Sequence, residues 1–307
     1  MNQLTLWITI ITLSLAVGSS YISIKIVLDF MPPLFAFSIR FMISGGTLIL
    51  VSYIFNKKNQ DKKNQEIKKI KLWTNSLIIA IFMIFAGHGL LAWGAQFLTA
   101  GTASLLNSTI PLWVALLLFL LFHYKITSLT KLGLFLGFGG MIILVGPSIG
   151  GGKGSDLIGI ASLLLSSLSM AIASVYYAKV SMPQSVLLSA GMLMLIGGAL
   201  QGVSSVLLGE LTLLPSYSDI TLNFLISYLF LIFICTVIPI AELFWLLKVS
   251  TPSIATTFAY IAPIAAVFFG WAILGESVTY LTIIATIVIL IGVALIVRTS
   301  GKKELLS

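Results

Sequence analysis

Three charged side chains stand inside long apolar runs of this sequence, where a fixed charge needs either a partner or a function. They are Lys25, Arg40 and Glu242. At membrane depth such a charge costs about 2.5–3.5 kcal/mol even on lenient scales. Lys25 precedes Asp29 by one helical turn, so a local ion pair is one explanation for it and gating is another. All three residues are therefore candidate gating or charge-bearing groups.

Arg40 and Glu242 each have two explanations that the sequence leaves open. Arg40 could pair with Asp29 or with carbonyls at a helix end, or it could act in gating or bind a substrate carboxylate. Glu242 could extend toward the inner membrane surface or pair with Lys179 or Lys248, or it could have a functional role.

Polar and aromatic side chains also recur at helical spacing within several apolar runs. Small residues in such stripes let helices pack closely, whereas tyrosine, asparagine and lysine are poor spacers and favour a cavity lining. His88 near mid-membrane could be a satisfied core donor, or it could contact substrate or respond to protons. The candidate substrate-binding residues are Tyr21, His88, Trp93, Asn107, Tyr176, Trp245 and Tyr260.

An amphipathic amino acid would suit a cavity of this composition. Aromatic walls accept an apolar side chain, and Arg40 or Lys25 could attract a carboxylate from the outer side. Proton coupling through His88 or Glu242 is compatible with the sequence but not required by it. We expect a small-molecule substrate, and we expect neither a cofactor nor a metal site.

The rival hypotheses come from other classes of protein. HExxH, CxxC and Walker motifs do not occur in the sequence, so an enzyme is not expected. An intramembrane enzyme or a lipid-handling membrane protein is the main alternative. A channel or receptor is a third possibility, which no filter-like motif supports.

The composition requires a membrane environment for these residues. Hydrophobic residues make up 59% of the 307 and charged residues only 8%, with a mean hydropathy of +1.13. Apolar runs of about 20 residues without alternation favour a helical bundle over a β-barrel. The net charge of +8 is explained by membrane orientation and not by nucleic acid. The single cysteine, Cys235, excludes an internal disulfide, and we interpret it as a packing residue.

Ten membrane spans fit the chain, the first being a retained helix and not a signal peptide. They are roughly 4–28, 33–55, 73–97, 101–122, 129–147, 157–179, 186–209, 223–247, 253–273 and 279–297. Of the 17 lysines and arginines, Lys25 and Arg40 lie within spans and Lys153 lies outside, which leaves fourteen in inside loops. This count predicts that both termini are cytoplasmic. The expected location is the bacterial cytoplasmic membrane.

A weak internal repeat with an offset of 152 residues divides the chain. The residues that keep this register include Trp93 and Trp245, Pro111 and Pro263, and Gly140 and Gly292. Because each half holds five spans, an odd number, the second half must be inverted relative to the first. The predicted fold is an all-α membrane protein of ten helices in two inverted five-helix repeats, 1–147 and 157–307, with a joint at 148–156.

Two segments resemble a known family. Ala255–Val293 contains Tyr260, a nearby proline and a Leu-Gly-Glu tripeptide, and Pro32–Gly46 (PPLFAFSIRFMISGG) places an arginine before an aromatic residue. These segments resemble the EamA-type branch of the drug/metabolite transporter superfamily. The resemblance implies ten spans, two repeats and export or exchange of small metabolites, often amino acids. Family members often carry a glutamate in both halves, whereas here Tyr124 aligns with Glu276.

Overall fold

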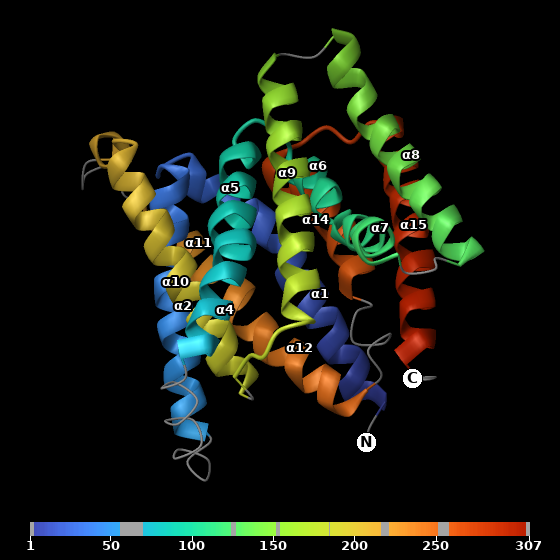
Figure 1. Cartoon of the computed structure of the whole chain (residues 1–307). Coiled ribbons are helices and arrows are strands. Elements are labelled where there is room, and N and C mark those ends of the chain that lie inside the picture. Colours follow the sequence, from blue (N-terminus) through green and yellow to red (C-terminus); the bar gives the residue numbers. More distant parts are fainter. Residues whose placement is uncertain are drawn as a thin grey trace.

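The fold is a bundle of apolar helices (Figure 1). The computed structural model describes residues 3–55, 70–123, 127–151, 154–183, 185–215, 221–250 and 258–304, and every regular element in these ranges is helical. Nine helical segments there are long and apolar enough to cross a membrane. A further apolar helix, Phe258–Leu274, is shorter. Each of these ten segments lies on one of the predicted spans.

The helices follow one another with short connections. In chain order they are α1 (Gln3–Leu28), α2 (Pro33–Phe55), the run α4 (Ile70–Ala80), η2 (Ile81–His88) and α5 (Gly89–Ala95), the pair α6 (Ala100–Asn107) and α7 (Ile110–Phe122), α8 (Ser128–Gly151), α9 (Gly154–Tyr177), α10 (Val186–Leu207), the 3₁₀ turn η3 (Glu210–Leu213), the run α11 (Leu222–Leu229), η5 (Phe230–Val237) and α12 (Ile238–Val249), α14 (Phe258–Leu274) and α15 (Tyr280–Glu304).

Local sequence signals set several of these boundaries. Thr99, Ser185 and Thr221 are N-caps whose side chains accept a backbone N–H at the starts of α6, α10 and α11. Pro111 stands in the first turn of α7, where its missing N–H costs no hydrogen bond. Gly275 follows α14 with φ of 66°, a conformation that ends the helix.

The most extensive contacts join helices that are distant in the sequence. α2 packs on α10, α8 on α15, and α1 on α14, while α9 packs on η2, α5, α6 and α7. Backbones approach closely at glycines: a Cβ on Gly45 would lie 2.9 Å from the Gly191 carbonyl oxygen, and one on Gly292 would lie 2.5 Å from the Gly137 nitrogen. Such close approach is the packing mode that membrane helices favour.

Two π-helical segments, η2 and η5, interrupt the third and eighth spans. A π turn leaves backbone carbonyls without their usual partners, so other groups must satisfy them. Around η2, side chains of α9 and α10 donate these bonds: Ser169 to Phe82 O (2.7 Å), Gln201 to Ile84 O (2.9 Å) and Ser166 to Gly87 O (2.6 Å).

Two glutamates cap helices that lie far from them in the sequence. Glu210 accepts hydrogen bonds from the start of α2, including Phe35 N at 2.8 Å. Glu276 does the same at the start of α6, where Ala100 N lies at 2.7 Å. A carboxylate at a helix N-terminus satisfies free N–H groups and complements the helix dipole.

The predicted joint at 148–156 includes the end of α8 and the start of α9. α8 continues to Gly151 and α9 begins at Gly154, so only 152–153 fall between them, and these two lie outside the described residues. The division into repeats stays a prediction on this point.

Candidate functional site

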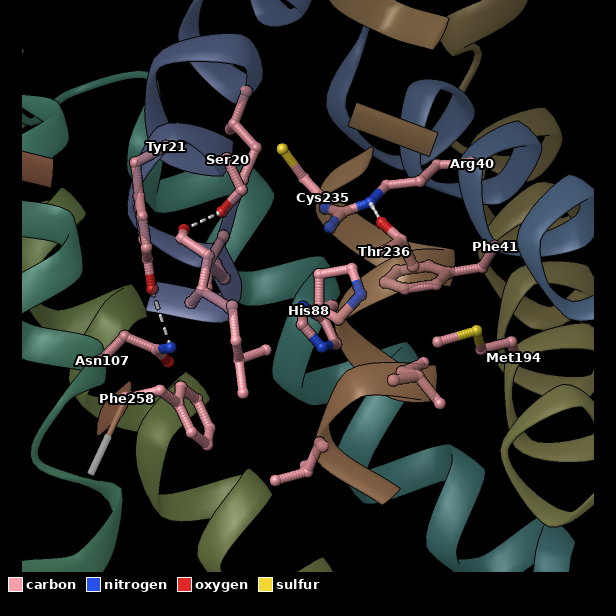
Figure 2. Close-up of a pocket in the computed structure, with 17 residues that line it drawn as sticks. Ser20, Tyr21, Arg40, Phe41, His88, Asn107, Met194, Cys235, Thr236 and Phe258 are labelled. Atoms are coloured by element: carbon pink, nitrogen blue, oxygen red, sulfur yellow. Dashed lines mark hydrogen bonds between the residues drawn. The ribbon is translucent and has the colours of Figure 1, made fainter. Parts of the chain in front are cut away.

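A cavity of about 240 Å³ opens among helices from both ends of the chain (Figure 2). Its walls come from α1, α2, η2, α5, α6, α10, η5, α12 and α14. Apolar side chains such as Leu13, Val17, Leu243 and Phe258 form much of the lining. The polar lining residues are Ser20, Tyr21, Arg40, His88, Asn107 and Thr236.

Among the described residues that line this cavity, Arg40 alone carries a formal charge. Its side chain is 5% exposed, and its Nε donates to Thr236 Oγ1 at 3.0 Å. The guanidinium carbon lies 5.0 Å and 5.1 Å from the ring centroids of Phe37 and Phe41, within cation–π range. Nη1 is buried without a hydrogen-bond partner. The cation is therefore held in place, but no carboxylate in the ranges that the structure describes neutralises it.

The π-helix η5 positions the hydroxyl that holds Arg40. Thr236 accepts from Arg40 and donates its own hydroxyl to Leu231 O, five residues back, at 2.7 Å. Thr236 and its neighbour Cys235 both belong to this π-helical segment, and both line the cavity. Cys235 is buried, as expected for a packing residue, but it also lines the cavity.

Two further polar groups face the cavity with unused hydrogen-bonding capacity. Asn107 donates its Nδ2 to the Tyr21 hydroxyl at 2.9 Å, which leaves Asn107 Oδ1 buried without a partner. His88, the last residue of η2, stacks 4.9 Å from the Phe41 ring, and its Nδ1 is buried without a partner. Figure 2 shows His88 on the same side of the cavity as Arg40, and Asn107 beside Tyr21 on the opposite side.

Of the predicted site residues, Tyr21, Arg40, His88 and Asn107 therefore come together around one cavity. Lys25 does not join them: its ammonium group donates to the Leu98 carbonyl, and it forms no ion pair with Asp29, which is also among the described residues. Arg40 likewise has no acidic partner within the described part of the chain.

The other predicted residues lie away from the cavity lining. Glu242 accepts from the Thr12 hydroxyl at 2.8 Å through Oε1. Trp245 on α12 is exposed at the bundle surface. Tyr260 is partly buried beside a separate apolar cluster that includes Ile289.

Trp93 and Tyr176 also lie elsewhere. Trp93 is exposed and packs edge-on against Phe97 at 5.3 Å, next to a surface pocket at the other end of α5. The Tyr176 hydroxyl donates to Asn75 Oδ1 at 3.5 Å.

Sequence reasoning missed Ser20, Phe41, Met194, Thr236 and Phe258, which also line the cavity. Phe41 had a signal, because it directly follows the arginine on the same helix. Thr236 had none, because its direction depends on a π turn that apolar periodicity does not reveal.

The cavity has the composition of a small-molecule binding site. It combines one unneutralised cation, neutral hydrogen-bonding groups and apolar walls. Within the described ranges, no three His, Cys, Asp or Glu side chains gather as a metal site would require. Such an arrangement suits a small amphipathic ligand with an anionic end.

Comparison with known proteins gives a consistent result. A family model described as the EamA-like transporter family matches residues 5–146 and again 157–298. The chain is 28% identical over 287 residues to the uncharacterized inner membrane transporter YedA of Escherichia coli K12, covering 93% of this chain and 87% of that protein. It is 25% identical to the uncharacterized transporter YoaV of Bacillus subtilis, covering 96% and 97%.

More distant similarity extends to plants and to a solved structure. A chloroplastic WAT1-related protein of Arabidopsis thaliana is 26% identical over 299 residues, covering 96% of this chain and 70% of that protein. One crystal structure shares the fold with a TM-score of 0.63 at 17% identity, covering 99% of each chain. At that identity the likeness concerns the fold alone.

Proposed function

Because the chain belongs to the EamA-like transporter family, we propose that it moves small amphipathic metabolites that carry a carboxylate, amino acids or similar compounds. It is a multi-pass membrane transporter of the drug/metabolite transporter superfamily, as the two sequence segments predicted. We propose that it works as a secondary transporter that exports or exchanges its substrate across the bacterial cytoplasmic membrane, with both termini cytoplasmic.

The observation that carries this proposal is the cavity around Arg40. Its walls come from α1, α2, η2, α5 and α6 in the first half and from α10, η5, α12 and α14 in the second. A site between two halves is the position at which alternating access exposes a substrate first to one side and then to the other.

The packing of the helices supports two inverted halves. α1 packs on α14 while α9 packs on α6 and α7, and α2 packs on η5 while α10 packs on α4 and η2. If each helix is replaced by its counterpart 152 residues away, the first pairing in each of these two comparisons becomes the second. The family model also matches the chain twice, at the same spacing. We therefore propose alternating access by rocking of one half against the other.

Flux measurements test the proposal directly. The purified chain is reconstituted into sealed vesicles, and uptake of a labelled amino-acid mixture is compared with that of protein-free vesicles. Asn107→Leu, which removes an unused acceptor from the cavity, should lower uptake at matched protein levels. Trp271→Phe, on the exposed surface of α14, is the matched control. No uptake above protein-free vesicles, or equal loss in both variants, would contradict this site.

A further inference from the structure

The cavity contains a positive charge that the surrounding protein does not balance. Arg40 Nη1 is buried without a partner, and none of the described residues lining the cavity is acidic. Glu242 is the acidic residue of α12, but it lies six residues after Thr236, roughly 9 Å along a helix axis, and it bonds to Thr12 on α1.

The groups that surround the guanidinium reduce the free-energy cost of burying it, but they do not neutralise its charge. The Thr236 hydroxyl and the rings of Phe37 and Phe41 are dipoles and quadrupoles, which stabilise a cation but carry no net charge. A buried cation without a counterion is costly, so a ligand that brings a negative charge is favoured.

The second unused group, Asn107 Oδ1, is a neutral acceptor. It can receive a hydrogen bond from a ligand hydroxyl or from a ligand ammonium group. An amide oxygen does not, however, balance the full charge of an ammonium, and the described part of the lining offers no carboxylate to do so. A bound zwitterion would therefore leave one positive charge uncompensated beside Arg40.

From this charge balance we propose that the preferred substrate is a net monoanion. It is a small carboxylate with a hydrogen-bond donor and an apolar body, favoured over the zwitterionic amino acid of the same carbon skeleton. The carboxylate pairs with Arg40, the donor group faces Asn107, and the apolar body lies against Leu13, Val17 and Leu243. This inference rests on the proposed function, because it takes the cavity to be the transport site.

Matched ligands that differ only in charge test the inference on the wild-type protein. Phenyllactate, phenylalanine and phenylalaninamide form one series, and leucine, its hydroxy-acid analogue and its amide form a second. Binding is measured by calorimetry on the full chain in lipid nanodiscs at neutral pH. In at least one series the hydroxy acid should bind about tenfold tighter than the amino acid, and the amide weakest of all. Equal or tighter binding of both amino acids, or no binding of either hydroxy acid at millimolar concentration, overturns the proposal.

Variants then assign the preference to one residue. Arg40→Gln should abolish the preference for the hydroxy acid, whereas Arg40→Lys should weaken but keep it. Lys25→Gln removes a cation that is bound to Leu98 outside the cavity lining, so the ratio of affinities should not change. A preference that survives in folded Arg40→Gln, or disappears in Lys25→Gln, overturns the assignment. The wild-type affinity order needs no variant, so the proposal stays testable if Arg40→Gln does not fold.

Vesicle flux separates this inference from the proposed function. Binding of the hydroxy acid without flux of any probe would contradict transport and leave the charge preference standing. Flux in which both amino acids outpace their hydroxy acids would leave transport standing and overturn the charge preference.

Discussion

At Arg40 a short stretch of one helix already provides most of what a buried cation needs. Phe37, three residues before it, shares its helical face, and the ring of the next residue, Phe41, also lies within cation–π range of its guanidinium. The remaining contact comes from Thr236, nearly 200 residues further along the chain. The arginine and its aromatic neighbour are visible in the sequence, whereas its distant hydroxyl partner requires the fold.

Cys235 offers a probe of this electrostatic environment, because it is the one cysteine in the sequence and lines the same cavity. We compare the rates at which an anionic and a cationic methanethiosulfonate reagent react with Cys235. The ratio of the anionic to the cationic rate should be higher at Cys235 than for a free thiol in solution. The reason is that the unneutralised Arg40 attracts the anion.

The measurement is the rate of mass increase of the purified protein, and Cys235→Ser gives the blank. Arg40→Gln should remove the bias between the two reagents. A bias toward the cationic reagent in the wild type would contradict the electrostatic account of the cavity.

Helical spacing predicted some of the cavity-lining residues correctly, but it also selected residues that lie elsewhere. Tyr21 and Asn107 were predicted from polar positions in apolar runs, and they hydrogen-bond to each other at the cavity. Trp245 satisfied the same criterion but lies exposed on α12, where lipid would surround it. A large aromatic residue is equally at home against lipid, substrate or another helix, so its spacing alone does not distinguish them.

At the scale of helices, spans and their order could be predicted, but their internal irregularities could not. Hydropathy locates every helix of the bundle within a few residues. The π segments η2 and η5 depend instead on donors from other helices, such as Ser166 of α9. The sequence of the third span does not indicate that its carbonyl groups accept hydrogen bonds from the sixth and seventh spans.

We expect Ser166→Ala to destabilise the protein by about 1 kcal/mol, because it leaves the Gly87 carbonyl of η2 buried without its donor. The measurement is thermal unfolding in one detergent at fixed protein concentration. Ser205→Ala is the matched control: Ser205 is equally buried, but its hydroxyl has no partner. Loss of that hydroxyl should be neutral or stabilising. Equal destabilisation by both changes would show that packing, and not the carbonyl bond, is responsible.

For the whole molecule, the cation count and the odd number of spans in each half make a topology prediction. Reporter fusions at Lys63 and Ser307, both outside the described residues, should be cytoplasmic, and one at Gly151 should be outside. Alkaline phosphatase and green fluorescent protein fusions give opposite signals on the two sides. An external Ser307 fusion would refute the orientation and, with it, the inverted repeat.

The two ends of the bundle differ chemically, although the sequence predicts two similar halves. Glu210 and Glu276 cap α2 and α6 at the end that the topology assigns to the outside, and both connect the second half to the first. The positions 152 residues earlier hold Lys58 and Tyr124, neither of which is a carboxylate, and both lie outside the described residues. At the outer end, two glutamates therefore join the predicted halves. At the corresponding positions of the inner end the sequence has no acidic residue.

We expect Glu210→Ala combined with Glu276→Ala to shift the protein toward an outward-open state. A lost cap costs about 1 kcal/mol, and a change of that size moves an equilibrium about fivefold, so two caps should be readily detectable. The readout is labelling of Cys235 by a membrane-impermeant thiol reagent added outside intact cells, which should accelerate in the double variant. Asp156→Ala is the control, because Asp156 is an acid of the same end whose side chain, among the described residues, accepts a hydrogen bond from its neighbour Ser155 and caps no distant helix. A folded double variant with unchanged external labelling would mean that the two glutamates hold helices in place without closing the outer side.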